Sequence, residues 1–309
     1  MPTFLRLLSC VLLLAPWSTT RGAAPVPAGD AHVLVLGRIS DDPKTHYEQL
    51  KPLLDYVVPR MAGVGIREGR ILMARDAQQM ASYLRRGRVD WVTETSGTAM
   101  LLEQRTGALP LLLTERDGVS RYHTLFLARR DTGLAGIESM RGRSIAFQNN
   151  TSTSSFFVPA AELLARGLPL TLMLSPRDRP APDEVGYVFA RTELNVATWV
   201  HKRMVDVGAM SNLDWDNPAR VPPSYRADIE VIHRSADFPR ALEMVRPGMD
   251  PKVRERLRQV LEGAASDPDA HEAMLRFFKT TRFLPIDQEA DQSLRRLGEG
   301  VARVRAQVE

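Results

Sequence analysis

The feature that most constrains the fold is a repeated alternation of short apolar runs with longer segments of helical spacing. Residues 32–40 (HVLVLGRIS) are apolar, and residues 44–62 then place apolar side chains at helical intervals. The alternation restarts after residue 121, and from Asp250 onward the pattern predicts helices alone. Strands alternating with helices predict an α/β fold whose sheets are rich in parallel strands and flanked by helices. Further strands are predicted at 70–74, 89–94, 109–115, 143–147, 184–190, 205–210 and 229–235.

Two such units in tandem predict two lobes. The extended segments at 122–130 and 229–244 are the predicted crossings between them. We therefore expect lobe 1 to comprise residues 30–130 plus 237–309, and lobe 2 to comprise residues 131–236.

The first 24 residues have the pattern of a signal peptide. Arg6 precedes the apolar run LLSCVLLLAPW, and small residues follow it, so several cleavage points between Gly22 and Ala28 are acceptable. The run is shorter than the roughly 20 apolar residues that span a bilayer. We expect export to the periplasm. Cys10 is the single cysteine, so the exported chain has no thiol or disulfide chemistry; a lipid anchor there is disfavoured, because the apolar run follows Cys10 instead of preceding it.

Several function classes are disfavoured by composition and motifs. The formal net charge is +4, and basic residues are interleaved with acidic ones instead of forming the concentrated face that binds nucleic acid. The six histidines lack metal-ligand spacing. No G-x-S-x-G elbow or glycine-rich phosphate loop occurs either. We therefore expect no enzyme activity, metal or cofactor, and a secreted hydrolase remains a distant alternative.

Five consecutive hydroxyl residues, 151–155 (TSTSS), lie between a predicted strand and a predicted helix. Pro159 is tolerated only in a first helical turn, so the helix should begin near residues 154–156. Free backbone N–H groups and the helix dipole favour an anion at such a position. An ordinary helix cap needs only one hydroxyl. A similar junction at residues 93–98 (TETSGT) makes an anion site the better interpretation.

Residues 147–159 (FQNNTSTSSFFVP) resemble the signature of periplasmic solute-binding proteins of the phosphonate and phosphite type, which serve ATP-driven importers. Segments 86–97, 199–210 and 229–265 resemble other parts of that family in the same order. The resemblance implies a type II periplasmic-binding-protein fold that captures a small phosphonate, phosphite or phosphate between its lobes. It also implies delivery to the membrane permease of an ABC importer. The alternative is a sensory protein of the same fold that docks on a membrane receptor, since both roles need only a closable cleft, and we expect a monomer. It places Ser152, Thr153 and Ser154 on the family's hydroxyl triplet that contacts the ligand. Thr151 joins this predicted set as a further hydroxyl at the helix start.

Three departures from the family pattern leave the ligand's identity open. Residues 93–96 replace an aromatic residue and a Gly-Pro-like turn, Glu193 replaces a frequent histidine, and Arg203 replaces a glycine. Glu94 and Glu193 would repel an ionised oxyanion. They could instead accept a hydrogen bond from a protonated phosphoryl oxygen, pair with an ammonium group or lie solvated at the rim. Arg38 could also neutralise Glu94.

The remaining candidates follow from strand position. Ligands bind beyond the carboxyl ends of strands in open α/β sheets, and Arg38, Ser40 and Tyr47 lie at or after the end of the first predicted strand. Asp206 is expected either to hold the hinge or to contact ligand. The predicted ligand-binding set also includes Glu94, Thr95, Ser96 and Glu193.

Overall fold

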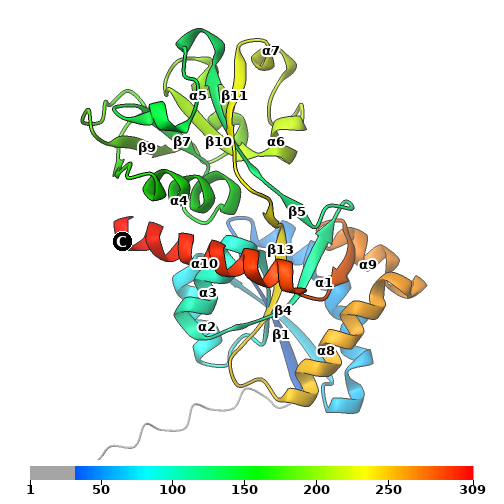
Figure 1. Ribbon diagram of the computed structural model, residues 1–309. Helices are drawn as coiled ribbons and strands as arrows, with labels where there is room; N and C mark the ends of the chain where they lie inside the picture. The colour runs from blue at the N-terminus through cyan, green and yellow to red at the C-terminus, as the bar shows by residue number, and fades with distance from the viewer. Residues whose placement is uncertain (1–31, 309) are drawn as a thin grey trace, which may run out of the picture.

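The computed structural model describes residues 32–308, which form two lobes, each built around a six-stranded mixed sheet (Figure 1). The predicted signal peptide, residues 1–24, lies outside the described residues. Within them, no helix has both the length and the apolar character needed to cross a membrane. The lobe boundaries at residues 130 and 237 remain our proposal.

Lobe 1 contains four strands that run in one direction and two that oppose them. β1 pairs in parallel with β2 and β3, while β13 lies antiparallel between β3 and β4. The sheet order is β14-β4-β13-β3-β1-β2. Its strands are β1 (Val33–Ile39), β2 (Glu68–Ala74), β3 (Trp91–Thr95), β4 (Leu109–Arg116), β13 (Ala241–Val245) and β14 (Thr280–Leu284).

Helices cover both faces of this sheet, and their ends follow ordinary capping rules. Asp42 accepts from the Thr45 amide at the start of α1, where Pro43 occupies the first turn, and Asp76 caps α2 in the same way. The helices of lobe 1 are α1 (Pro43–Arg60), α2 (Ala77–Arg85), α3 (Ser96–Thr106), α8 (Pro251–Gly263) and α9 (His271–Arg276).

Lobe 2 has the sheet order β11-β6-β10-β7-β9-β8, in which β10, β7, β9 and β8 are parallel neighbours and β6 is antiparallel to β10 and β11. Its strands are β6 (Thr124–Arg129), β7 (Ser144–Phe147), β8 (Leu170–Leu172), β9 (Val185–Phe189), β10 (Val207–Ser211) and β11 (Ile229–Arg234). Its helices are α4 (Val158–Ala165), α5 (Glu193–His201), α6 (Asn212–Asp216) and α7 (Pro223–Arg226).

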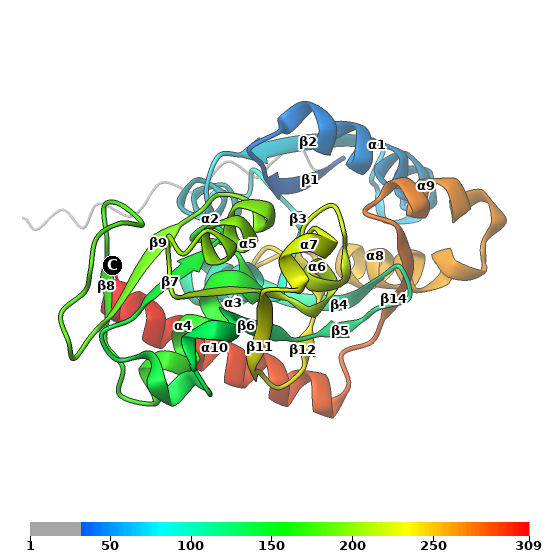
Figure 2. The same cartoon turned by 90° about the horizontal axis from the view of Figure 1, so that it is seen from above.

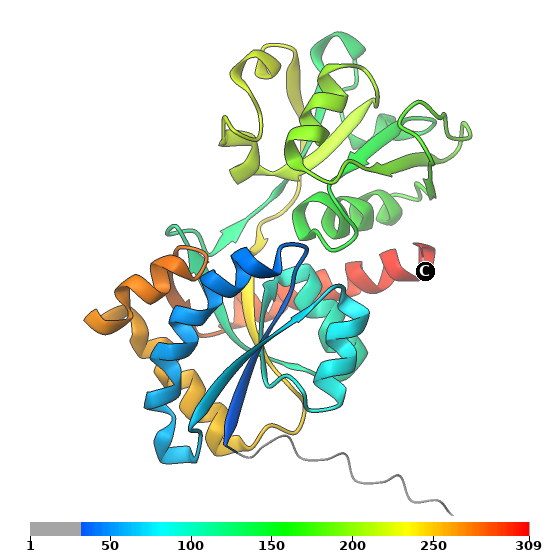
Figure 3. The same cartoon turned by 180° about the vertical axis from the view of Figure 1, so that it is seen from behind.

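Two chain segments connect the lobes and pair with each other. β5 (Arg121–Tyr122) and β12 (Phe238–Pro239) form a short antiparallel ladder, whose two strands are labelled near each other in Figure 2, and β5 lies between the lobes in Figure 1. A final helix, α10 (Gln288–Val308), passes between the lobes and packs against both α3 and α4 (Figure 3). Its buried face, which includes Leu294, Leu297 and Val301, belongs to an apolar core shared by both lobes.

The prediction of helices alone after Asp250 was wrong, because β14 lies between α9 and α10. The segment TTRFL forms a strand through its pairing with β4, with one irregularity in register: Phe283 is buried, while Arg282 pairs at 2.7 Å with Glu115 of β4. The predicted extended segment at 122–130 is also divided at His123 into β5 and β6, because the chain changes sheets there.

Candidate functional site

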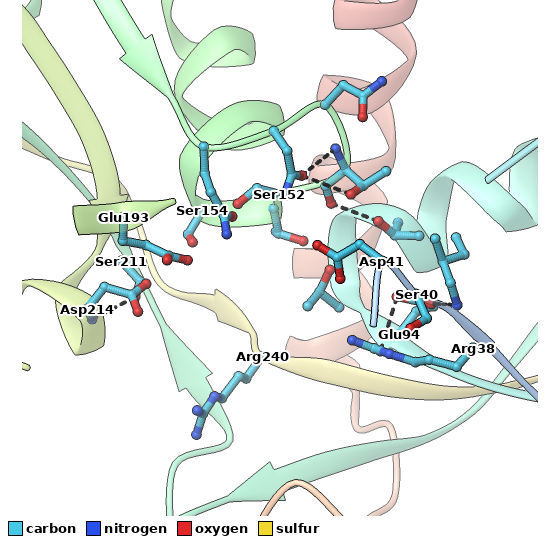
Figure 4. A pocket seen from close by; sticks show the side chains of 18 of the residues that line it. Arg38, Ser40, Asp41, Glu94, Ser152, Ser154, Glu193, Ser211, Asp214 and Arg240 are labelled. Atoms are coloured by element: carbon cyan, nitrogen blue, oxygen red, sulfur yellow. Dashed lines mark hydrogen bonds and ion pairs between the residues drawn. The ribbon is translucent and has the colours of Figure 1, made fainter. Parts of the chain in front are cut away.

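A polar cavity of about 510 Å³ lies between the lobes, at the carboxyl ends of strands from both sheets (Figure 4). Lobe 1 contributes the ends of β1, β3 and β4. Lobe 2 contributes the loop after β7 and the first residues of α5 and α6. Of the twelve predicted ligand-binding residues, those that line this cavity are Arg38, Ser40, Glu94, Thr95, Thr151, Ser152, Thr153, Ser154 and Glu193.

The hydroxyl cluster forms a π-helical turn, Thr153–Phe157, that leads into α4. The Ser152 hydroxyl caps this turn by accepting from the Ser155 amide at 3.1 Å, and the Phe157 amide donates to the Ser152 carbonyl at 3.0 Å. Such turns are rare and occur often at functional sites. Because the first turn of a helix leaves amide donors without intrahelical partners, this end of the segment favours an anion.

Neighbouring hydroxyls of the cluster have different environments. Ser155 is buried, accepts from the Gln148 amide at 2.8 Å and donates to the Ala209 carbonyl, so it holds the loop to the sheet. Ser154 lines the cavity, and so does Tyr122. Burial raises the pKa of Tyr122 to about 12, so its phenol stays protonated and can donate.

The two strand-to-helix junctions meet across the interface between lobes. The Gly97 amide, in the first turn of α3, donates to the Thr153 hydroxyl at 2.8 Å, and the Thr98 hydroxyl donates to the Thr151 carbonyl at 2.8 Å. A Cβ atom at Gly97 would lie 2.8 Å from both the Thr153 hydroxyl and the Phe157 ring. Close approach of the two junctions therefore requires a glycine at this position.

On the lobe 1 side, arginine and glutamate side chains are packed together. Arg38 pairs with Glu94 at 3.2 Å and donates to the Thr93 carbonyl at 2.8 Å. Glu94 also accepts from the Ile39 amide at 2.8 Å, yet burial raises the pKa of its carboxyl group. Arg116 is only 8% exposed, and burial, followed by the charge of Arg38, lowers its pKa to about 9. Glu94 is thus compensated by Arg38, one of the interpretations left open by the sequence.

On the lobe 2 side, two carboxylates face the cavity. Figure 4 shows Glu193 and Asp214 lying close together beside Ser211. Burial raises the pKa of Glu193, and the charge of Asp214 raises it further, although Arg220 pairs with Glu193 at 3.0 Å. The part of the cavity beside these two carboxylates therefore disfavours an anionic group, in contrast to the part lined by the hydroxyl segment.

Three predicted residues do not line the cavity. Tyr47 is 46% exposed on α1, where the neighbouring His46 lines the cavity instead and bonds to Ser40 at 2.6 Å. Ser96 is buried and donates to the Pro239 carbonyl. Asp206 accepts from the amide and hydroxyl of Ser144, both at 2.8 Å, at the amino ends of β7 and β10. Because the cavity lies at the carboxyl ends of these strands, Asp206 is at the opposite edge.

Several residues that line the cavity were not predicted from the sequence. Arg116 ends β4, and Asp214 follows the end of β10. The strand-end rule that identified Arg38 would have identified both of these residues. Arg240, just before the antiparallel β13, and Tyr122, in a crossing, carry no such signal. Within residues 32–308, no group of three or more His, Cys, Asp and Glu side chains is arranged to hold a metal ion.

Comparisons with known proteins agree with this architecture. XAC2383 from Xanthomonas citri, solved with chloride ion, is 57% identical and covers 90% of this chain and 100% of its own, with a TM-score of 0.86. Its structure bound to ATP, at 56% identity, has the same coverage and a TM-score of 0.85. PhnD1 from Prochlorococcus marinus, in complex with methylphosphonate, shares the fold at 13% identity, with a TM-score of 0.64 over 89% of this chain and 100% of its own.

A protein family matches most of the chain. Residues 37–291 match the family described as the periplasmic substrate-binding protein of phosphonate ABC transporters. The match spans both lobes and the whole cavity, in agreement with the resemblance of the hydroxyl segment. The chain therefore belongs to the periplasmic substrate-binding proteins of phosphonate ABC transporters.

Proposed function

We propose that this protein captures a small phosphoryl oxyanion, a phosphonate, phosphite or phosphate, in the cavity between its lobes. The observation that carries the proposal is the position of Ser154, at the start of the π-helical turn, where its hydroxyl faces the cavity. Neutral hydroxyl and amide donors at a helix start suit a tetrahedral anion without requiring a buried counter-charge.

The ligand would be carried in the periplasm to the permease of an ABC importer, with the protein acting as a monomer. The two structures of XAC2383 support an anionic ligand, since that protein is bound to chloride ion in one and to ATP in the other. Delivery to a membrane sensor would use the same cavity. Copurification of the protein with a permease would support delivery to an importer, whereas copurification with a sensor kinase would support delivery to a sensor.

The direct test compares two adjacent serines. Ser154→Ala should weaken binding of methylphosphonate, phosphite or phosphate by about tenfold to a hundredfold, since a hydrogen bond to a charged group is worth about 1.5–3 kcal/mol. Its melting temperature should change little. The matched control is Ser155→Ala, which removes a buried hydroxyl with two hydrogen bonds and should mainly lower stability. Calorimetric titration and thermal melts of the same samples give both quantities.

Unchanged affinity of Ser154→Ala for an anion that the parent protein binds would contradict the proposed role. If Ser154→Ala lost stability as Ser155→Ala does, with no loss of affinity, the cluster would serve only as a helix cap.

A further inference from the structure

Three guanidinium groups gather on the lobe 1 side of the cavity. Arg38, Arg116 and Arg240 all line it, and their charges are close enough that Arg38 and Arg240 each disfavour the charged form of Arg116. Arg240 also donates to the Arg116 carbonyl at 2.5 Å. We refer to these three residues as the arginine cluster. Because three positive charges repel one another here, other contacts in the fold must stabilise the guanidinium groups in this position.

The ring of Phe278 supports two members of the cluster. The guanidinium carbons of Arg38 and Arg116 lie 4.9 Å and 4.5 Å from the centre of this ring. A guanidinium group at this distance from an aromatic face is attracted to it. Phe278 has a φ of 55°, in the left-handed region that is unfavourable for a residue with a side chain. The cluster is thus fixed in place by packing as well as by charge.

The nearby acidic residues do not fully compensate the cluster. Glu94 pairs with Arg38, and Glu243 is completely buried, where it accepts from the neutral donors of Trp91, Thr93 and Thr114. Three cations thus face two buried carboxylates. Among the residues that the structure describes, no acceptor lies within hydrogen-bond distance of the buried Nε of Arg38 or of Arg116. These two guanidinium groups are therefore incompletely paired, and their positive charge would stabilise an anionic group in the cavity beside the cluster.

The cluster lines the same cavity as the hydroxyl segment. Tyr122 also lines it, between the charges of Asp214, Arg240 and Arg116, all three of which act on its hydroxyl group. Glu193 and Asp214 line a different part of the lobe 2 wall and would repel a negative group beside them, although Arg220 pairs with Glu193 at 3.0 Å. A second anionic group on a ligand held at Ser154 is therefore directed toward the arginine cluster.

We propose that the arginine cluster is a second anion subsite, and that the preferred ligand is a diphosphoryl compound with one group at Ser154 and the other at Arg116 and Arg240. This inference rests on the proposed function and names the substrate class of the same cavity. The recognising chemistry is charge-assisted hydrogen bonding from guanidinium groups to the second phosphoryl group.

Titration calorimetry with phosphate, methylphosphonate and pyrophosphate in one buffer tests this inference. The parent protein should bind pyrophosphate at least about tenfold more tightly than phosphate, as expected for additional charged hydrogen bonds. We expect the affinity for pyrophosphate to fall by about tenfold in each of the variants Arg116→Gln and Arg240→Gln. The affinity for methylphosphonate should fall by about twofold or less in the same variants. Arg295→Gln is the matched control, because Arg295 is exposed on α10, pairs with Asp291 at 2.8 Å and does not line the cavity.

The outcomes separate the two claims. If the parent protein binds phosphate and binds pyrophosphate no more tightly, the second subsite is refuted while the proposed function stands. The same holds if the arginine variants lower the affinities for pyrophosphate and methylphosphonate equally. If none of the three compounds binds, the proposed function fails as well. Arg240 is only half-buried, so its variant provides a result even if Arg116→Gln does not fold.

Discussion

At the scale of single residues, Glu193 is a carboxylate whose charge bears directly on the proposed anion site. Glu193 is mostly buried beside Asp214, and these two effects, burial first, raise its pKa. A glutamate whose pKa is raised in the folded state binds its proton more tightly than in the unfolded chain. Its contribution to stability is therefore lost as the pH rises from the ordinary glutamate value, about 4.3, to the raised value. Above that range it is an ionised group facing the site for an anion.

Glu193→Gln should strengthen binding of phosphate severalfold at neutral pH, because it removes a like charge without changing the shape of the side chain. The variant should also melt at a higher temperature than the parent protein at neutral pH. Both gains should shrink as the pH falls through the raised pKa of Glu193, and vanish below it. Calorimetric titrations and melts across this pH range measure both. A loss of affinity would instead show that Glu193 pairs with a cationic group on the ligand.

The sequence located the hydroxyl cluster but did not assign a task to each hydroxyl. Ser154 and Ser155 are chemically identical, and their difference arises from the π-helical turn, which directs one into the cavity and the other toward the Ala209 carbonyl. The sequence pattern does not reveal which of two adjacent hydroxyl residues points into the cavity. Arg240 was missed for a similar reason, since only the antiparallel insertion of β13 brings it to the carboxyl ends of β1, β3 and β4.

At the scale of elements, the site depends on two helix starts that meet. The first turn of α3 and the hydroxyl segment before α4 come from different lobes, and the bond from Gly97 to Thr153 joins them. The sequence predicted both junctions, each as a strand followed by hydroxyl residues and a helix. It did not predict that they contact each other, because that contact depends on how the lobes close. β14 was missed because its five residues lie between two helical patterns and are stabilised by pairing with β4.

Gly97→Ala should separate these junctions, because its Cβ would also approach the Thr153 Cα to 3.3 Å. We expect about tenfold weaker binding of the anion, equivalent to the loss of roughly one charged hydrogen bond. The control is Gly263→Ala at the end of α8, where an added Cβ meets no atom within 4 Å. X-ray scattering should show a more open shape for Gly97→Ala alone. Parent-like affinity and shape in this variant would show that the contact is unnecessary for closure.

At the scale of the whole molecule, the lobes are connected by two crossings and by α10. The crossings, β5 and β12, pair with each other, and α10 packs on a helix of each lobe. Gly300 of α10 approaches Ala161 of α4 so closely that a Cβ at Gly300 would lie 3.0 Å from the Ala161 Cβ. Such an arrangement suits hinge closure around a bound ligand, with α10 as a shared surface. The two-lobed α/β class was predictable from the alternation of segments, whereas the position of α10 across both lobes required the structure.

The most direct test of the central claim is calorimetric titration of the purified protein with phosphate, phosphite, methylphosphonate, pyrophosphate and ATP, beside amino acids and sugars. We predict that at least one phosphoryl compound binds with a stoichiometry of one. At a hundredfold excess over its Kd, it should stabilise the fold by about 2.7 kcal/mol. Tight binding of an amino acid or a sugar, with no binding of any phosphoryl compound, would contradict the account.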